Sequence, residues 1–174
     1  MFFLQMSGFP GSGKSALARE IAGRTGAVVI DHDVTKTALL ETPEGAGMDG
    51  KTSGSISYHI DWSIIESILS QERNVIFDSP CLYQEMIIKG TNLARKYRAS
   101  YKYVKCFLDD FDLINERLKN RERKISQIRE VKSLEGFKKT LENSKKPEGH
   151  RYLVVDTSMG LDTYIDEVME YLVE

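Results

Sequence analysis

The sequence holds few of the residues that build disulfide frameworks or zinc sites. Only two cysteines and three histidines occur in 174 residues, and Cys81 and Cys106 form no CxxC or CxxH pattern. This spacing argues against a zinc or redox site. A chain of this length also buries about two thirds of its unfolded surface without cross-links. We therefore expect both cysteines to be small, buried apolar residues.

Long hydrophobic runs and a strong charge imbalance are also missing. No stretch approaches about 18 apolar residues, and the first residues, MFFLQMSGFP, carry no basic segment. These features predict neither a signal peptide nor a transmembrane helix, and they favour a cytoplasmic protein without a membrane partner. The net charge of -2 argues against general electrostatic binding of nucleic acid, although a local basic patch is present.

Short apolar runs alternate with helical patterns along the whole chain. The runs that we expect as strands cover residues 2–6, 27–30, 74–77, 101–108 and 152–155. The helical patterns cover residues 14–24, 34–40, 54–71, 83–98, 110–120 and 160–173. This alternation predicts an α/β fold with a mostly parallel sheet covered by helices on both faces. No linker divides the chain, so we expect one domain over residues 1–174.

Two segments interrupt this alternation. Residues Glu41 to Ser55 are rich in Gly, Ser and Thr without apolar periodicity, which predicts a mobile loop that is either a linker or a substrate flap. Residues Arg117 to Ser133 carry seven Lys or Arg residues. Cations of this kind stabilise the charge that develops during phosphoryl transfer, which favours a lid, while a solvated helix face is the alternative.

The stretch GFPGSGKS follows the first expected strand and opens the first expected helix. Gly8, Gly13, Lys14 and Ser15 satisfy the pattern G-x-x-x-x-G-K-[ST]. Such a loop points backbone N–H groups at phosphate oxygens, its lysine reaches the β- and γ-phosphates, and its serine coordinates Mg²⁺. We therefore expect nucleotide binding by Gly8, Pro10, Gly11, Ser12, Gly13, Lys14, Ser15 and Ala16.

Carboxylates follow the second and third expected strands. Asp31 and Asp33 come after VVI, and Asp78 ends NVIFD, where parallel sheets bind ligands. In an extended segment Asp31 and Asp33 project to one side, so that one holds a water on Mg²⁺ and the other accepts a proton from a hydroxyl. Asp33 also has the alternative role of capping the helix expected at Val34. Asp78 is a metal candidate of the Walker B kind, and a turn-forming residue is its alternative.

Taken together, these motifs resemble the small P-loop kinases, the group of polynucleotide 5′-hydroxyl kinases, zeta-toxin-like kinases and chloramphenicol phosphotransferase. The resemblance rests on GFPGSGKS, VVIDHD, NVIFDSPC and ERLKNRER in their expected order. It implies a three-layer αβα P-loop NTPase fold with a five-stranded sheet of order 2-3-1-4-5 and a small helical lid at about residues 117–133. It also implies ATP as the phosphoryl donor, with Mg²⁺.

The resemblance further implies roles for individual residues. Asp33 is similar to the base for the acceptor hydroxyl, and Asp31 to the aspartate that holds a metal-bound water. Arg117, Arg121 and Arg123 resemble adenine-stacking and lid positions, with the last two assigned to catalysis beside Lys14. Separately, the chain near Thr157 is placed either around adenine or at the cap of the last helix.

These motifs predict an ATP-dependent phosphotransferase that acts on a hydroxyl of a small-molecule or nucleotide-like acceptor. Two alternatives stay open: a nucleotide-hydrolysing switch and a polynucleotide 5′-hydroxyl kinase. The sequence has no Asn-Lys-x-Asp motif for guanine and no Glu after Asp78 to activate water, which counts against the switch. A nucleic-acid partner is not favoured.

Overall fold

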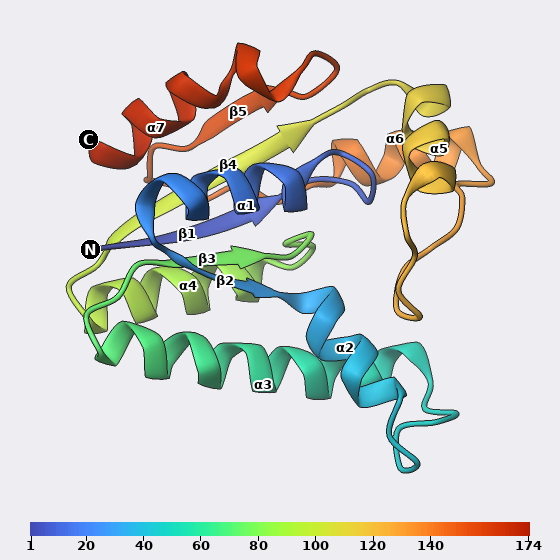
Figure 1. Ribbon diagram of the computed structural model, residues 1–174, viewed down its shortest axis with the longest axis horizontal. Helices are drawn as coiled ribbons and strands as arrows, with labels where there is room; N and C mark the ends of the chain where they lie inside the picture. The colour runs from blue at the N-terminus through green and yellow to red at the C-terminus, as the bar shows by residue number, and fades with distance from the viewer.

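A computed structural model describes residues 1–174, and its centre is a five-stranded parallel sheet (Figure 1). The strands are β1 (Phe2–Ser7), β2 (Val28–Asp31), β3 (Val75–Asp78), β4 (Ser100–Phe107) and β5 (Leu153–Asp156). Their order in the sheet is β2-β3-β1-β4-β5. This arrangement confirms the predicted P-loop NTPase fold class and strand order.

Seven α-helices and one 3-10 turn connect and cover the strands. They are α1 (Lys14–Thr25), α2 (His32–Leu40), α3 (Gly50–Ser70), α4 (Gln84–Lys96), α5 (Phe111–Asn120), α6 (Leu134–Glu142), η1 (Leu161–Thr163) and α7 (Ile165–Val173). Helices α1 and α7 cover one face of the sheet, and α3 and α4 cover the other (Figure 1). None of the helices is both long and apolar enough to cross a membrane.

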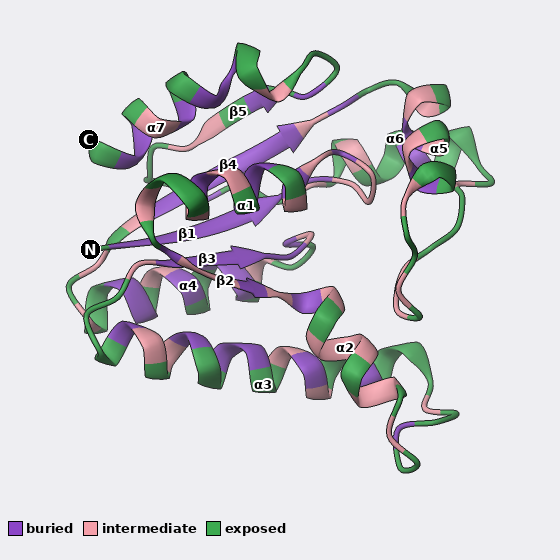
Figure 2. Ribbon diagram, viewed as in Figure 1, coloured by how far each residue is buried: buried purple, intermediate pink, exposed green.

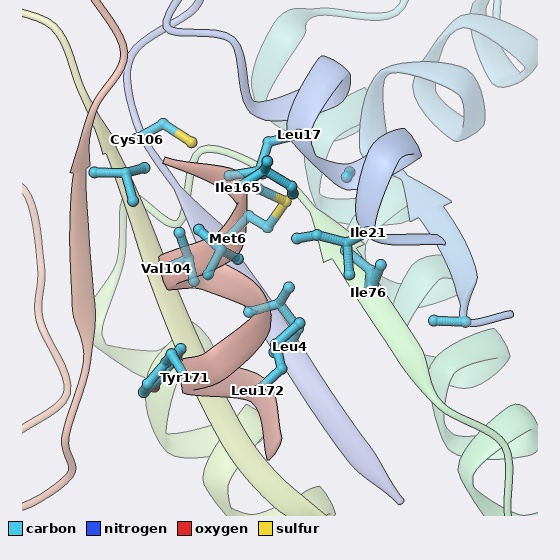
Figure 3. Close-up of a cluster of buried hydrophobic side chains, with 14 of the residues drawn as sticks. Leu4, Met6, Leu17, Ile21, Ile76, Val104, Cys106, Ile165, Tyr171 and Leu172 are labelled. Atoms are coloured by element: carbon cyan, nitrogen blue, oxygen red, sulfur yellow. The ribbon is translucent and has the colours of Figure 1, made fainter. Parts of the chain in front are cut away.

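The central strand β1 is buried along its whole length (Figure 2). Leu4 and Met6 project into the cluster formed with α1 and α7 (Figure 3), whereas Phe3 projects into the cluster formed with α3 and α4. Alternate residues of a strand point to opposite faces, so a strand covered on both sides must be apolar at nearly every position. Burial on both faces of the sheet therefore explains the continuous apolar run in the sequence of β1.

Both cysteines are buried and free, as predicted. Cys106 lies in the cluster beside α1 and α7, and Cys81 lies in the cluster on the opposite face. Burial raises the pKa of the Cys81 thiol to about 11 and that of the Cys106 thiol to about 12. Both side chains therefore stay protonated at neutral pH and act as apolar core groups.

The predicted loop over residues 41–55 is too long, because α3 begins at Gly50 and not near residue 54. The Asp49 side chain accepts hydrogen bonds from the backbone N–H groups of Lys51 and Thr52. A carboxylate at this N-cap position satisfies two of the N–H groups that a helix start leaves unpaired. Glycine and serine in the first turns of α3 obscured this start in the sequence.

The predicted helical lid also needs correction. Helix α5 ends at Asn120, residues 121–133 form a loop with turns, and a separate helix, α6, follows. Phe137 of α6 packs against Ile114 and Leu118 of α5 in a small buried cluster. This cluster anchors both ends of the loop 121–133, which we call the lid loop, beside the carboxyl ends of the strands (Figure 1).

Candidate active site

The loop between β1 and α1 is shaped by its glycines. Gly8, Gly11 and Gly13 have φ angles of 144°, 87° and 86°, which favour residues without a Cβ. A Cβ atom on Gly8 would also lie 2.5 Å from the Cys106 carbonyl oxygen. The loop therefore curls tightly between the end of β1 and the start of α1, as the phosphate-binding motif requires.

Lys14 is the first residue of α1, and its side chain folds back over this loop. Its Nζ donates hydrogen bonds to the carbonyl oxygens of Gly8 at 2.8 Å and Phe9 at 3.2 Å. The residue is buried, and its ammonium group lies at the start of the helix beside Ser15. The charge is thus held where the loop would cradle a phosphate group.

Asp31 and Asp78 are neighbours in register at the ends of β2 and β3. Asp78 is only 4% exposed. Burial raises the pKa of its carboxyl group above 3.8, although the charge of Lys14 and a hydrogen bond from Ser15 act in the opposite direction. The three residues that we expected around Mg²⁺, namely Ser15, Asp31 and Asp78, therefore belong to adjacent elements at one edge of the sheet.

Asp33 does not continue the strand, and it is not the cap of α2. The helix begins at His32, and the Asp31 Oδ1 atom accepts the N–H of Asp33 at 2.9 Å. The expectations that Asp33 lies in an extended segment or caps a helix at Val34 are both wrong, because Asp31, with φ of -96° and ψ of 110°, is the N-cap. Asp33 instead projects from the first helical turn.

The lid loop contacts both of these carboxylates. Lys124 Nζ lies 3.4 Å from Asp31 Oδ2, and Gln127 Nε2 donates to Asp33 Oδ2 at 2.8 Å. The Ser126 hydroxyl donates to Asp33 Oδ1 at 3.3 Å. Sequence reasoning assigned the lid to its arginines and missed these three polar residues, which have no motif of their own.

The cavity beside the phosphate loop, which we call the loop cavity, has a volume of about 510 Å³. Predicted site residues that line it are Pro10, Gly11, Gly13, Lys14, Ser15, Ala16, Asp33, Asp78, Arg117 and Arg121. Lys124 and Gln127 of the lid loop line it as well. The structure therefore brings the phosphate loop, the strand-end carboxylates and the basic segment around one space.

Five predicted site residues do not line the loop cavity: Gly8, Ser12, Asp31, Arg123 and Thr157. Gly8 and Ser12 shape the phosphate loop from behind, and Asp31 is covered by Lys124. Arg123 donates to the Gln127 carbonyl oxygen, and the buried Thr157 hydroxyl donates to the Phe107 carbonyl oxygen. The Thr157 side chain thus supports the site from the interior.

The two predicted site arginines that line the loop cavity, Arg117 and Arg121, are held by backbone carbonyl groups. Arg117 donates to the Thr157 carbonyl oxygen at 2.8 Å, and Arg121 donates to the Ile128 carbonyl oxygen at 2.9 Å. Burial lowers the pKa of the Arg121 guanidinium from its usual value, with the charge of Asp33 acting against this shift. Neither arginine forms an ion pair with a carboxylate, so their charge is directed at the cavity.

A second cavity, of about 1050 Å³, adjoins the first, and we call it the α3 cavity. Six residues line both cavities: Pro10, His32, Asp33, Pro80, Arg121 and Gln127. Its further walls come from α2, α3, α4 and the lid loop. Asp33 therefore lies between a space beside the phosphate loop and a larger space beyond it.

His32 and Asp61 form a buried polar pair at this boundary, which sequence reasoning did not find. His32 Nδ1 lies 2.7 Å from Asp61 Oδ2, and the imidazole stacks on the Tyr58 ring at 3.7 Å between centroids. The pair ties the start of α2 to α3. No local sequence pattern indicates this pair, because Asp61 lies 29 residues from His32.

The residues at the edge of the sheet fit a magnesium ion bound together with a nucleotide. Ser15, Asp31 and Asp78 offer only oxygen donors, which are the ligands that Mg²⁺ prefers. No group of three or more His, Cys, Asp or Glu side chains converges into a protein-only metal cage. This agrees with the habit of Mg²⁺ to bind through one or two carboxylates, several waters and substrate phosphates.

Comparison with known proteins agrees with this geometry. A family model described as an AAA domain matches residues 4–144. The chain belongs to this AAA domain family. No curated protein sequence matches the chain. The match and the kinase structures described next confirm the predicted relation to the small P-loop kinases.

Solved structures similar to this chain include two kinases and a protein in complex with ADP-AlF3. A gluconokinase from Sinorhizobium meliloti 1021 is 19% identical with a TM-score of 0.62, over 99% of this chain and 91% of that one. The Mycobacterium tuberculosis APS kinase CysC, in complex with AMPPNP and APS, is 14% identical with a TM-score of 0.62, over 99% and 98%. Chaetomium thermophilum Kti12, in complex with ADP-AlF3, is 12% identical with a TM-score of 0.64, over 98% of each chain. These similarities establish a kinase-like fold.

Asp78→Asn is expected to flatten the pH dependence of the stability of this AAA domain. Because the pKa of Asp78 is raised in the folded state, the folded protein keeps this proton at pH values above 3.8 at which the unfolded chain has lost it. The free energy of unfolding therefore falls as the pH rises from 3.8 through the folded-state pKa of Asp78. The amide carries no charge to desolvate, so the variant should unfold at a higher temperature than the parent at pH 7. Thermal unfolding from pH 4 to pH 7, without nucleotide or Mg²⁺, measures this effect.

Asp112→Asn is the matched control, because Asp112 is an exposed aspartate in the first turn of α5. Its unfolding temperature should follow that of the parent across the same pH range. An Asp78→Asn protein that is less stable than the parent at pH 7 would show that the Asp78 charge contributes to stability through Lys14.

Proposed function

We propose that this chain is an ATP-dependent phosphotransferase that transfers the γ-phosphoryl group of ATP to a hydroxyl of a small-molecule or nucleotide-like acceptor. The observation that carries the proposal is the place of Asp33 in the wall shared by the loop cavity and the α3 cavity. A base between a donor space and a separate acceptor space has a use in group transfer. A switch that hydrolyses its nucleotide with water needs no separate acceptor space.

The phosphate loop is the proposed donor half of the site. Gly11, Gly13 and the N–H groups at the start of α1 would surround the β- and γ-phosphates, and Lys14 would exchange its two loop carbonyl partners for phosphate oxygens. Mg²⁺, held by Ser15 and through water by Asp31 and Asp78, would supply further positive charge to the phosphates. Arg117 and Arg121, which line the same cavity, would add positive charge around the nucleotide.

Asp33 is the proposed base for the acceptor half. Its carboxylate would accept the proton of the acceptor hydroxyl as that oxygen bonds to the γ-phosphorus and the bond from the γ-phosphorus to the β–γ bridging oxygen breaks. ADP leaves with the electron pair of the broken bond. Gln127 and Ser126 would fix the orientation of the carboxylate through the hydrogen bonds described above.

Arg121 is the proposed residue for stabilising the transferred group. It lines both cavities, and its guanidinium has unused N–H donors because only one hydrogen bond to protein, to Ile128, engages it. Charge spreads over the equatorial oxygens of the transferring phosphoryl group, so a guanidinium at the boundary would act on the transition state more than on the bound substrates. Arg123 would act only if the lid loop rearranged, because it does not line either cavity.

The decisive experiment measures ADP release from ATP over a panel of hydroxyl compounds, together with the mass gain of each acceptor. The proposal requires ADP release that depends on an acceptor and a phosphorylated product. ADP release at the same rate without any acceptor would support the switch instead. Product formed only on oligonucleotides with a free 5′-hydroxyl, with salt-sensitive binding, would assign the chain to polynucleotide kinases.

A further inference from the structure

The α3 cavity is an elongated groove along one face of α3. Gly50, Gly54, Tyr58 and Trp62 line it at intervals of four residues, which places them in a row on the same side of the helix. The row covers about 18 Å at 1.5 Å per residue. The two ends of the groove are therefore far apart, and they differ in their charged residues.

One end of the groove holds two lysines from different helices. Lys36 of α2 reaches the first turn of α3, where its Nζ lies 3.4 Å from the Gly50 carbonyl oxygen, and Lys51 follows directly in the same turn. No carboxylate lies within 4.0 Å of either ammonium group. The nearby Asp49 carboxylate does not line the groove and accepts hydrogen bonds from the start of α3. These two cations are therefore free to bind an anion.

The distance from this end to the proposed base suits a small molecule. Asp33 and Lys36 are three residues apart on α2, and such residues lie on one helix face with Cβ atoms about 5–6 Å apart. Both line the groove. An acceptor whose hydroxyl contacts Asp33 would thus present its next few atoms to Lys36.

The other end of the groove is lined by both a lysine and a glutamate. Lys89 of α4 lies over the Trp62 ring at 5.3 Å, and Glu85, one turn earlier on α4, also lines the groove. Positive charge at this end is thus accompanied by an acidic side chain of the same helix, unlike the pair Lys36 and Lys51. Lys89 therefore offers an internal control for charge in the same cavity.

We infer that the acceptor is a hydroxyl compound with an anionic carboxylate or phosphate group, and that this group binds between Lys36 and Lys51. The inference rests on the proposed function, because Asp33 sets the position of the reacting hydroxyl. Tyr58, one turn along α3 from Gly54, provides an apolar surface for the carbon skeleton. The cations act on the bound acceptor in both the ground state and the transition state, so they should govern KM more than kcat.

Matched pairs of acceptors test the inference. We would compare glycerate with glycerol, gluconate with glucitol, and adenosine 3′-monophosphate with adenosine, so that carboxylate and phosphate are distinguished. The anionic member of at least one pair should have a kcat/KM about 10- to 100-fold higher, the range of one charged hydrogen bond. Lys36→Met should remove this preference mainly by raising KM, Lys36→Arg should restore it, and Lys89→Met should leave it unchanged.

A binding measurement makes the test independent of turnover. Calorimetry on the Lys14→Ala protein, in which the donor site is impaired, should show tighter binding of the anionic member and loss of that difference in the Lys14→Ala, Lys36→Met double variant. If the neutral member of every pair binds as tightly as the anionic member and has the same kcat/KM, the inference is overturned while the proposed function stays intact. If an anion binds in a manner that depends on Lys36 but no acceptor is phosphorylated, the proposed function is overturned and the anion site at Lys36 and Lys51 stands.

Discussion

Asp33→Asn protein is expected to lose about 10²- to 10⁴-fold in kcat for acceptor-dependent ADP release, the range of general-base catalysis. The substitution keeps the shape of the side chain and removes its proton-accepting charge. Asp33 is half-buried and makes its hydrogen bonds with Gln127 and Ser126 of the lid loop, so an amide of the same shape still fits between them. Steady-state kinetics with the best acceptor gives kcat, and calorimetry gives the affinity for ATP.

The affinity for ATP should stay within a few-fold of the parent, because the Asp33 side chain bonds to the lid loop and to no residue of the phosphate loop. The control is Asp112→Asn, which changes an exposed aspartate at the same helical position of α5. Unchanged turnover in Asp33→Asn would remove Asp33 from the mechanism. Asp78 and Glu122, the other carboxylates that line the loop cavity, would then be the next candidates for the base.

Lys14→Ala should abolish most ATP-dependent turnover, with a loss of about 10²- to 10³-fold in kcat, as found when one electrostatic donor to a transition state is removed. Lys14 is buried, and its only partners are two carbonyl oxygens of its own loop. Without nucleotide the lysine thus bonds to groups that accept weakly. Phosphate oxygens carry full charge and would replace them favourably.

The measurement for Lys14→Ala combines turnover with calorimetric titration of ATP, and ATP affinity should fall together with kcat. Lys119→Ala is the control, because Lys119 is an exposed lysine in the last turn of α5. The Lys14 variant should remain folded, since it loses only two hydrogen bonds, each worth about 1 kcal/mol. Retention of parental ATP affinity and turnover would contradict the assignment of the donor site.

The strands and the place of the phosphate loop were predictable because the relevant information is local, whereas the strand order 2-3-1-4-5 was implied by the resemblance to the small P-loop kinases. The apolar run of β1, the glycines at 8, 11 and 13, and the amphipathic start of α1 each lie within a few residues of one another. A strand buried on both faces must be apolar along its length, and a tight loop before a helix needs positive φ angles. The assignment of one domain over residues 1–174 stays a prediction.

The helix boundaries near the site were less predictable, because polar residues hid them. The predicted helices 34–40 and 54–71 begin two and four residues too late, at positions that Asp31 and Asp49 cap. An aspartate that follows a strand in the sequence is equally compatible with three roles: a helix cap, a metal ligand or a catalytic base. Only the observed hydrogen bond from the Asp33 N–H to Asp31 Oδ1 shows that Asp31, and not Asp33, caps α2.

The sequence by itself thus determined the α/β class and the phosphate-loop motif of this protein, and the family resemblance added the strand order. The tertiary structure alone decided how the proposed acceptor side is built: Gln127 reaches Asp33 across 94 residues, Lys124 reaches Asp31 across 93, and Asp61 reaches His32 across 29. The lid loop has no regular periodicity, so no sequence pattern records which side chains it presents. Contacts of this kind are set by the packing of α5 and α6, which fixes where the loop begins and ends.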